Sequence, residues 1–583
     1  MSSGSTTGGV PPFSEPDIVI DRLPGGVIEL RSRRRLSDAP VTTLHWLRRW
    51  ARETPQAALL TEVEAGERRV LDYASAWSAS VRAAAALTER GIRPGDRVAV
   101  IATNSIESFI CGHAAMLVGA LWAPIAAQYL RPGADRDRIA GVLDLVDPAL
   151  IVVPDALLHA GLPDGRVAVT SIRPAGAQDG ASTDDPDDPH ALGDRLLDAA
   201  RDDDPVKLLL TSGSTGTPKA VVYTHRMLVS NMRATVDVWP FVTDHPPVLV
   251  DWLPWNHAFG GNANIDMVLL GGGTLHIDDA HGRPAELGRT IAAIKEFPPT
   301  FHAAVPATFQ ALLPVLEAEP EFRRALLGRA DALFSAGAAM PTGTFHRLRE
   351  LSLTVRENPV PVLTGWGSTE VGPAATTVHT ADSEPGQVGP PLPGVTVRLV
   401  PVAGKLELRV KGPSVMPTYW REPERTAAVF DADGFYCSGD AGVLVDEDDP
   451  GRGIRFDGRI ADDFKLANGS WVNVDRLRSS LLAAGGTGVR DVVVAGPDRS
   501  HLVAVFWLAD GAAVDVDAVV RAHNATTSGQ TNLIRAAAIL TAEPAAELLS
   551  PKGLLKPALF RSASADLIDA LYHPDSVLAK EPS

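Results

Sequence analysis

The sequence predicts an α/β fold with a large N-terminal domain of mixed sheets and helices, followed by a small α+β domain. The chain has 583 residues, and a single hydrophobic core stops growing at roughly 250–300 residues. After residue 40, short apolar runs alternate with amphipathic patterns, as in proteins built on parallel sheets. Near residue 460 this pattern changes. We therefore place a weakly structured lead-in at residues 1–40, the large domain at 41–459 and the small domain at 460–583.

The elements of the large domain follow from the spacing of apolar residues. The lead-in opens with Ser, Gly, Thr and Pro, and its basic cluster at residues 31–35 is typical of a solvated face. Beyond it, amphipathic spacing indicates helices, and apolar runs bounded by turn residues indicate strands. The expected helices are residues 42–51, 73–90 and 105–117, and the expected strands are residues 97–102, 149–153, 206–210 and 220–223.

Two further segments complete the organisation of the chain. Residues 174–205 are rich in Asp, Pro and Thr. Such a segment has little apolar surface to bury, so we expect a surface loop or tether there. In the small domain, residues 491–495 and 502–508 are expected to be strands joined by a hairpin turn, and residues 514–523 are expected to be a helix.

Composition and charge argue against several classes of function. The formal net charge is −17, whereas nucleic acids and anionic membrane surfaces require clustered Lys and Arg, so we expect neither as a partner. The two cysteines, Cys111 and Cys437, form neither a disulfide framework nor a metal-binding pattern. No secretory signal pattern and no apolar run of membrane-spanning length is present. We therefore expect a cytoplasmic protein.

A segment rich in glycine and hydroxyl residues lies between two apolar runs. Glycines let backbone amides approach an anion, Ser and Thr hydroxyls donate to phosphate oxygens, and a lysine offsets the negative charge. A flexible linker has no reason to lie between two strands, and the spacing differs from that of the P-loop. We predict that this segment binds nucleotide phosphates through Thr211, Ser212, Gly213, Ser214, Thr215, Gly216, Thr217 and Lys219.

The string TSGSTGTPKAV resembles the phosphate-binding signature of the adenylate-forming superfamily, which includes acyl-CoA synthetases, adenylation domains of peptide synthetases and luciferases. Other motifs of that family follow in the same order along the chain. The resemblance implies that Thr369 contacts phosphate and that Glu370 holds Mg²⁺, which prefers carboxylate and phosphate oxygens. It implies that Asp440 and Arg459 bind the ribose. It adds, as further nucleotide-binding positions, Gly337, Ala338, Ala339, Trp366, Gly367 and Ser368.

The resemblance also implies a mobile C-terminal domain that carries catalytic lysines. One lysine stabilises the charge that develops on the acid and the α-phosphate. Lys552 is the candidate for this role and Lys556 is its rival, while Lys465 is expected to enter the site for the second half-reaction. In the family, the hinge residue two positions after the ribose-binding arginine is Asp or Lys. Here that position is Ala461, so the position of the hinge stays open.

Residues 251–262 resemble the segment of the family that binds the organic acid. His257 resembles a gate beside the substrate carboxylate, and Phe259, Gly260 and Gly365 are expected to line a flat apolar slot. At least one of the two tryptophans in this segment, Trp252 and Trp255, is expected to pack in the core. The strings DWLPWNH, GGTLHIDD and DGRIADDFKL are similar to those of the aryl-CoA ligases related to feruloyl-CoA synthetase, and this similarity covers about residues 40–575.

The resemblance therefore implies an AMP-forming ligase that uses ATP and Mg²⁺ and joins a hydroxycinnamate- or benzoate-like acid to coenzyme A. An ATP- and nitrite-dependent diazotase acting on an aromatic amine in a natural-product pathway is an alternative, because it would use the same ATP site and aryl slot. An enzyme that loads a carrier protein also stays open. The intact motifs argue against an adenylate-binding module without turnover. The sequence leaves the organic substrate, the final acceptor and the oligomeric state undetermined.

Overall fold

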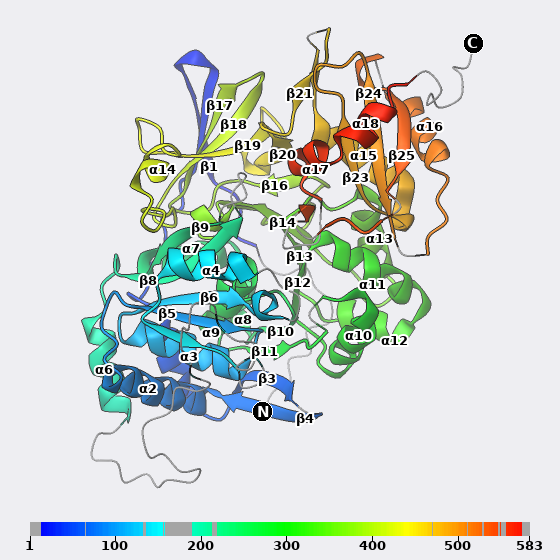
Figure 1. The fold of residues 1–583 in the computed structure, drawn as a ribbon. Coiled ribbons are helices and arrows are strands. Elements are labelled where there is room, and N and C mark those ends of the chain that lie inside the picture. The colour runs from blue at the N-terminus through cyan, green and yellow to red at the C-terminus, as the bar shows by residue number, and fades with distance from the viewer. Residues whose placement is uncertain are drawn as a thin grey trace.

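The computed structural model describes residues 13–64, 66–131, 136–154, 157, 162, 169, 189–212, 218–280, 282–468, 470–509, 511–527, 530–540, 542–545, 548–549 and 555–573. Within these residues the strands form six sheets, and helices pack between and around them (Figure 1). Among the same residues, no helix combines the length and the apolar composition needed to cross a bilayer.

A five-stranded sheet in the order β7-β5-β6-β8-β9 carries the predicted phosphate loop. Its first four strands are parallel, and β9 runs antiparallel to β8. The strands are β5 (Arg97–Ala102), β6 (Leu121–Ala126), β7 (Leu150–Val152), β8 (Pro205–Ser212) and β9 (Pro218–Thr224). Helix α3 (Ile106–Leu117) packs on β5 and β6, and Ser105 caps its first turn by accepting from the Ser108 amide. The predicted strands and the predicted helix at this sheet are confirmed.

Two four-stranded sheets complete the α/β part of the molecule. Each has three parallel strands and an antiparallel edge strand. The first, in spatial order, contains β10 (Val248–Asp251), β11 (Thr274–Ile277), β3 (Ala58–Glu64) and β4 (Glu67–Asp72). The second contains β12 (Phe301–Ala304), β13 (Ala332–Ser335), β14 (Val362–Trp366) and β15 (Thr376–Thr377).

A seven-stranded antiparallel sheet includes the N-terminal residues that the sequence assigns to a weakly structured lead-in. That prediction is wrong for residues 18–32, which form a hairpin whose second strand pairs with β17. The hydrogen bonds come from residues 365 to 371 positions further along the chain, so local composition does not reveal the strand. In spatial order the sheet contains β1 (Ile18–Leu23), β2 (Val27–Ser32), β17 (Thr396–Val402), β18 (Lys405–Lys411), β19 (Tyr436–Leu444), β20 (Ile454–Arg459) and β16 (Gln387–Gly389).

The helices of this part surround the sheets and enclose a shared core. This core is divided into several clusters, and the largest includes the buried aromatic residues Trp77, Trp122 and Tyr223. The helices are α1 (Leu44–Glu53), α2 (Tyr73–Glu89), α4 (Arg136–Val146), α6 (Pro189–Ala199), α7 (His225–Val238), α8 (Phe241–Asp244), α9 (Ile265–Gly271), α10 (Leu287–Glu296), α11 (Pro306–Ala318), α12 (Pro320–Leu327), α13 (Thr342–Ser352) and α14 (Pro423–Ala427). Short 3₁₀ turns are η1 (Pro24–Gly26), η2 (Ala127–Leu130), η5 (Pro284–Glu286) and η7 (Pro450–Arg452).

Helix α6 corrects the prediction of a loop or tether over residues 174–205. Its Leu197 is buried, and Asp194 pairs with Arg48 of α1 at 2.8 Å. A Cβ on Gly193 would lie 2.3 Å from the Trp77 ring, so the missing side chain lets α6 approach α2 closely. Packing against α1 and α2 therefore stabilises a helix in an acidic stretch. Residues 174–188 lie outside the described part of the chain.

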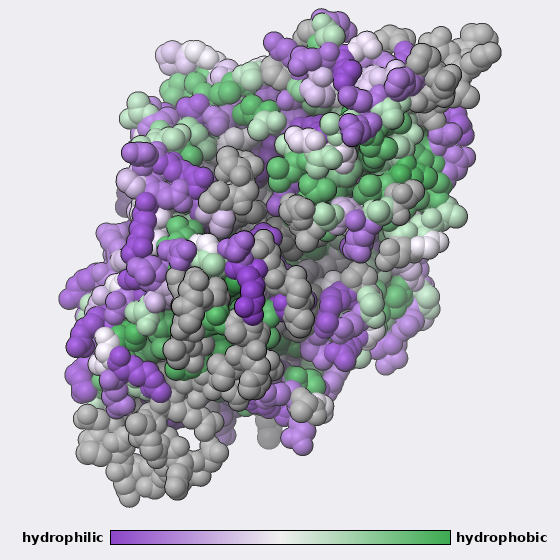
Figure 2. Space-filling model, viewed as in Figure 1, coloured by the Kyte–Doolittle hydropathy of each residue, from purple (hydrophilic) through white to green (hydrophobic). Residues whose placement is uncertain are grey.

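The C-terminal unit, from residue 460 onward, has hydrophobic cores of its own. These separate cores support the proposed division at residues 459 and 460. Figure 1 shows the unit beside the seven-stranded sheet. In Figure 2, viewed from the same side, hydrophobic residues gather on the surface of the unit that faces the viewer. Its elements are β21 (Phe464–Lys465), β22 (Trp471–Val472), α15 (Val474–Gly485), η8 (Gly486–Gly488), β23 (Val489–Ala495), β24 (Leu502–Leu508), α16 (Val516–Thr526), η9 (Gln530–Asn532), β25 (Ile534–Ile539), α17 (Pro557–Ala563) and α18 (Ala565–Ala570). The predicted hairpin at β23 and β24 and the helix that follows it are confirmed.

Candidate active site

The predicted site segments follow the carboxyl ends of strands in the three α/β sheets. The phosphate loop follows β8, the acid-pocket segment follows β10, residues 336–340 follow β13, and residues 367–370 follow β14. Ligands of open α/β sheets bind at this edge because the loops that follow the strands meet there. Contacts such as that between Phe259, which follows β10, and Phe334, in β13, then join segments from different sheets.

Lys219, Glu370 and Tyr419 form a compact charged centre. The Lys219 ammonium lies 2.7 Å from Glu370 Oε1 and donates to the Tyr419 hydroxyl at 2.5 Å. The Tyr419 hydroxyl in turn donates to the same Glu370 oxygen at 2.9 Å. Lys219 lies at the start of β9, and Glu370 lies in the short turn η6 (Thr369–Val371). The structure thus brings together the lysine and the glutamate that the sequence assigns to the phosphates and the metal.

The electrostatics of this centre favour an ionised carboxylate. Burial opposes the charge on Glu370, but the neighbouring Lys219 ammonium outweighs it and holds the pKa of Glu370 below its usual value. Burial and the Glu370 charge raise the pKa of Tyr419, so this phenol stays protonated and continues to donate. The centre therefore presents an ionised Glu370 carboxylate beside the Lys219 amino group.

A second cluster holds the predicted ribose carboxylate. Trp366 Nε1 donates to Asp440 Oδ2 at 2.9 Å, and Arg459 Nε lies 3.1 Å from Asp440 Oδ1. Asp440 and Arg459 face each other across β19 and β20. Burial raises the pKa of Asp440, and Arg459 opposes that shift. Because the charge of Glu370 also acts on Asp440, the two clusters belong to one site.

The phosphate loop itself is only partly described. Gly213, Ser214, Thr215, Gly216 and Thr217 lie outside the described residues, as does the side chain of Ser212. The flanking residues confirm the strand–loop–strand arrangement, because Thr211 pairs with Lys219 across β8 and β9. The buried Thr211 hydroxyl has no hydrogen-bond partner among the described residues.

Close backbone contacts explain the glycines of the predicted nucleotide segments. A Cβ on Gly367 would lie 1.9 Å from the Pro373 carbonyl oxygen, so no side chain fits there. Gly337 has a φ of 88°, a left-handed conformation that favours glycine. The Thr369 carbonyl accepts a hydrogen bond from the Tyr223 hydroxyl, which fixes the turn that carries Glu370. Ala338, Ala339 and Ser368 remain partly or fully accessible, as expected of positions that contact a ligand.

The acid-pocket segment folds into a tight π-helical turn, η4 (Phe259–Asn264). A Cβ on Gly260 would lie 2.2 Å from the Leu253 carbonyl oxygen, so the turn packs directly against its own entry segment. Phe259 is partly buried and contacts Phe334 edge-on with a centroid distance of 5.5 Å. His257 lies one turn earlier and is partly buried. Gly365 lies in β14, where a Cβ would be 2.9 Å from the Thr376 carbonyl oxygen.

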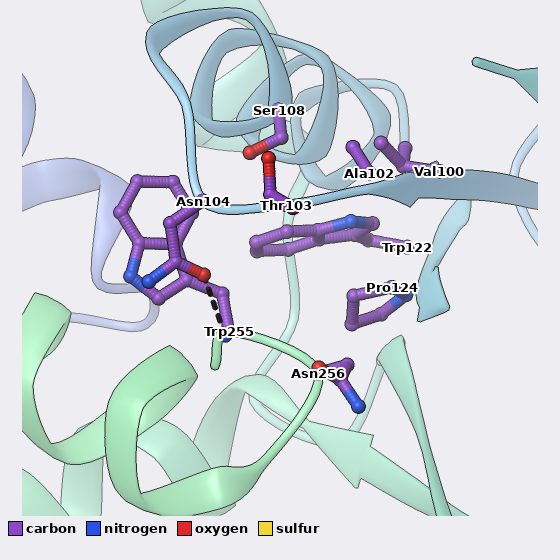
Figure 3. Close-up of a pocket in the computed structure, with 9 residues that line it drawn as sticks. All are labelled: Val100, Ala102, Thr103, Asn104, Ser108, Trp122, Pro124, Trp255 and Asn256. Carbon is purple, nitrogen blue, oxygen red and sulfur yellow. Dashed lines mark hydrogen bonds between the residues drawn. The ribbon is translucent and has the colours of Figure 1, made fainter. Parts of the chain in front are cut away.

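A small pocket lies beneath the start of the acid-pocket segment (Figure 3). Asn104 joins its two sides by donating to the Leu253 carbonyl and accepting from the Trp255 amide, each at 3.0 Å. In Figure 3 the Trp122 ring lies between the Thr103 side and the Pro124 side of the pocket. Trp255 is buried, which confirms that at least one tryptophan of this segment packs in the core.

The predicted lysines of the C-terminal unit lie on different segments. Lys465 is exposed on β21, and its carbonyl accepts from the Asp498 amide at 2.9 Å. Lys552 lies outside the described residues. Lys556 precedes α17, and its amide donates to the Leu548 carbonyl at 2.8 Å. Burial lowers the pKa of Lys556, and the Arg138 charge on α4 lowers it further, which places Lys556 near the large domain.

These residues fit the nucleotide and the metal that the family motifs imply. Glu370 supplies an ionised carboxylate of the kind that Mg²⁺ prefers. The Thr211 hydroxyl is a buried polar group without a hydrogen-bond partner among the described residues, as expected where a ligand oxygen would bind. Asp440 offers carboxylate oxygens of the type that accept from ribose hydroxyls.

Tyr419 is a residue of the site that the sequence reasoning missed. It follows Lys219 by 200 positions and meets it only in the folded chain. Tyr223 was counted only as part of an apolar run, yet its hydroxyl supports the turn that carries Glu370. The signal for Tyr223 in the sequence is a tyrosine within an otherwise apolar run, because a buried phenol requires a hydrogen-bond partner.

Comparisons with known proteins show the family to which the chain belongs. A family model described as AMP-binding enzyme matches residues 47–420, more than half of the chain. The chain is 32% identical to a feruloyl-CoA synthase of an Amycolatopsis species, covering 68% of this chain and 75% of the relative. It is 28% identical to 4-coumarate–CoA ligase 2 of Oryza sativa subsp. japonica, with 68% and 72% covered.

The structure of ATP-bound MatB from Rhodopseudomonas palustris shares the fold, with a TM-score of 0.68, 24% identity, and 90% of this chain and all of that chain covered. The predicted α/β architecture with a large domain and a C-terminal domain is therefore confirmed. The chain belongs to the family of AMP-binding enzymes and is an AMP-forming ligase.

Proposed function

We propose that this enzyme activates an aromatic carboxylic acid of the hydroxycinnamate or benzoate type as an acyl-AMP and transfers the acyl group to coenzyme A. The observation that carries the proposal is the Lys219–Glu370–Tyr419 centre next to the Asp440–Arg459 pair. This arrangement provides a cation for phosphate oxygens, a carboxylate for Mg²⁺ and a carboxylate for ribose hydroxyls within one site. Two relatives, named as a feruloyl-CoA synthase and a 4-coumarate–CoA ligase, support an aromatic acid as the substrate.

In the first half-reaction, a substrate carboxylate oxygen attacks the α-phosphorus of ATP and pyrophosphate leaves. Lys219 and the phosphate loop hold the triphosphate and offset its charge, and Asp440 with Arg459 holds the ribose. Glu370 would hold Mg²⁺, which neutralises the phosphate oxygens when it is bound. Catalysis of this step depends mainly on positioning and on charge stabilisation.

In the second half-reaction, the thiol sulfur attacks the acyl carbon and AMP leaves. The C-terminal unit presents Lys552 or Lys556 for the first step and Lys465 for the second, after a rotation near residues 460–462. The contact between Phe259 and Phe334 supports an apolar, aromatic wall for the organic substrate. His257, Gly260 and Gly365 complete the proposed acid pocket.

The test is ATP-dependent release of pyrophosphate across a panel of cinnamic and benzoic acids that includes ferulic acid, with coenzyme A present. We expect release that depends on the acid, and mass spectrometry is expected to find the acyl-CoA thioester. The Glu370→Gln variant is expected to lose this turnover. Glu296→Gln is the matched control, because Glu296 pairs with Arg68 on the surface at 2.6 Å.

Three outcomes would contradict the proposal. Turnover with arylamine and nitrite but with none of the acids would indicate the diazotase. If the acyl group of acyl-AMP passed only to a carrier protein, the carrier protein and not coenzyme A would be the acceptor. Undiminished turnover in Glu370→Gln would contradict the assignment of Glu370 as a ligand of Mg²⁺.

A further inference from the structure

Lys207 is a buried lysine that the adenylation chemistry leaves without a role. It lies in β8 and only 2% of its surface is exposed. Its ammonium donates to the Gly261 carbonyl and to Asn262 Oδ1, each at 2.7 Å. The ammonium also lies 4.1 Å from the centre of the Trp122 ring. Burying an ammonium group is unfavourable unless polar partners surround it, so these contacts are specific features of the fold.

Both hydrogen-bond acceptors of Lys207 belong to η4, the turn that carries Phe259 and Gly260. This turn is confined on its other side as well, because a Cβ on Gly261 would lie 2.0 Å from the Trp255 carbonyl oxygen. Asn104 holds the backbone around Trp255 through the hydrogen bonds seen beside the pocket in Figure 3. Lys207 therefore joins η4 to the sheet that leads into the phosphate loop.

The same contacts reach toward the phosphate side of the site. The Asn262 side chain lies beside the Tyr223 hydroxyl, which donates to the Thr369 carbonyl. Asp266, buried in α9, provides the negative charge that favours protonated Lys207. Burial lowers the pKa of Lys207 to about 7, and the Asp266 charge opposes this shift. A chain of polar contacts thus connects η4, β8 and the turn that carries Thr369.

We propose that Lys207 is a positioning residue that holds the η4 turn in register with the phosphate segments and thereby sets the affinity for the organic substrate. The inference rests on the proposed function, because η4 is assigned there to the acid pocket. Lys207 touches neither the predicted triphosphate site nor the Lys219–Glu370 pair in the contacts described above. Its loss is therefore expected to affect the acid more than ATP.

The test compares wild type with Lys207→Met, which keeps an unbranched side chain, one atom shorter, and removes the charge and the hydrogen bonds. We expect KM for ferulic acid, or for any other acid of the panel that is turned over, to rise about tenfold while KM for ATP changes less than about twofold. A purely structural role would lower the melting temperature and the active fraction and leave both KM values unchanged. Lys295→Met is the matched control, because Lys295 forms an ion pair with Glu319 at the surface.

A second variant isolates the hydrogen bond. Asn262→Leu removes one acceptor of Lys207. In the double variant of Lys207→Met and Asn262→Leu, KM for the acid is expected to be no higher than in the more affected single variant, because both changes remove the same contact. Asn262→Asp keeps an acceptor oxygen and is expected to stay near wild type. If the effects of Lys207→Met and Asn262→Leu on KM for the acid were fully additive in free energy, the proposal would be overturned.

Hydrogen exchange provides a readout that does not depend on turnover. In Lys207→Met, the amides of residues 257–264 are expected to exchange faster than in wild type, with no change in the peptide that covers β23. Unchanged exchange at residues 257–264 would overturn the inference even if the proposed function holds. If wild type turns over none of the acids, the proposed function fails, and the exchange result still decides whether Lys207 holds η4.

Discussion

The centre of the site concentrates opposite charges in a small, poorly hydrated space. The side chains of Lys219 and Glu370 are 19% and 7% exposed, so solvent and salt screen their attraction only weakly. Tyr419 contacts both members of the pair. A buried pair of this kind is most sensitive to the loss of one member, because the remaining charge is left without compensation.

At the scale of single residues, we predict that Tyr419→Phe lowers kcat/KM for ATP about tenfold. The lost hydrogen bond to a charged group contributes about 1.5–3 kcal/mol, whereas the direct Lys219–Glu370 contact remains. Steady-state kinetics with varied ATP measures the effect. Tyr572→Phe is the control, because its hydroxyl donates to the His501 carbonyl within the C-terminal unit. Equal kinetics for Tyr419→Phe and wild type would show that the phenol only fills space.

The backbone at Gly367 leads to a second prediction. Gly367→Ala forces a Cβ against the Pro373 carbonyl oxygen, so the segment that leads to Glu370 must shift. We expect a loss of turnover of more than about tenfold and a weaker affinity for ATP. Gly343→Ala in α13 is the control, because its Cβ would meet no atom within 4 Å. Similar activities for the two variants would contradict this account of Gly367.

At the scale of elements, Asp491 connects three segments of the C-terminal unit. Its Oδ1 accepts from Arg478 Nη2 of α15 at 2.6 Å, and its Oδ2 accepts from the Leu555 amide at 2.9 Å. Asp491 itself lies in β23 and is fully buried. The carboxylate therefore anchors the residue next to Lys556 to the sheet of this unit.

We predict that Asp491→Asn destabilises the C-terminal unit by about 3–5 kcal/mol, because it leaves the largely buried Arg478 without its anionic partner. Thermal unfolding is expected to shift to lower temperature, and turnover is expected to fall if this segment carries the catalytic lysine. Asp569→Asn is the control, since Asp569 pairs with Arg499 at the surface. An unchanged melting temperature for Asp491→Asn would contradict the anchoring role.

Ion pairs to the large domain lie on both sides of the proposed hinge. Arg459 pairs with Asp440 on the large domain. Asp463 joins the two units, because it accepts from the Lys405 ammonium of β18 at 2.5 Å and from the Val474 amide at 3.0 Å. The proposed rotation near residues 460–462 therefore requires the Asp463–Lys405 pair to break.

At the scale of the whole molecule, buried histidines make stability depend on pH. His302 and His379 are almost completely buried, and the described structure gives neither ring a hydrogen-bond partner. Burial lowers the pKa of each to about 4 from an ordinary value of 6.5. Between these values the unfolded state binds more protons than the folded state, so these residues lower stability as the pH falls through this range.

We predict that His302→Leu narrows the difference in melting temperature between about pH 7.5 and about pH 5 by several degrees relative to wild type. The comparison with wild type is needed because burial raises the pKa of Asp251 to about 7, which acts in the opposite direction. His346→Leu, at an exposed position, is the control. An equal pH dependence for His302→Leu and wild type would contradict the assignment.

The parts of the fold that were predictable are those whose pattern is local. The apolar run of residues 97–102 and the periodicity of residues 73–90 reappear as β5 and α2. The N-terminal hairpin and α6 were missed because their stability comes from β17 and from Trp77, respectively. Neither partner can be identified from the composition of the segment that it stabilises.

The sequence by itself determined the fold class and the order of the motifs, because short motifs specify local backbone geometry and the side chains that it presents. Only the tertiary structure decided that Lys219, Glu370 and Tyr419 meet, that Lys207 reaches under the proposed acid pocket and that Asp491 holds Leu555. These contacts join residues 49 to 200 positions apart. They depend on how whole sheets pack against one another, and no local spacing of residues encodes that packing.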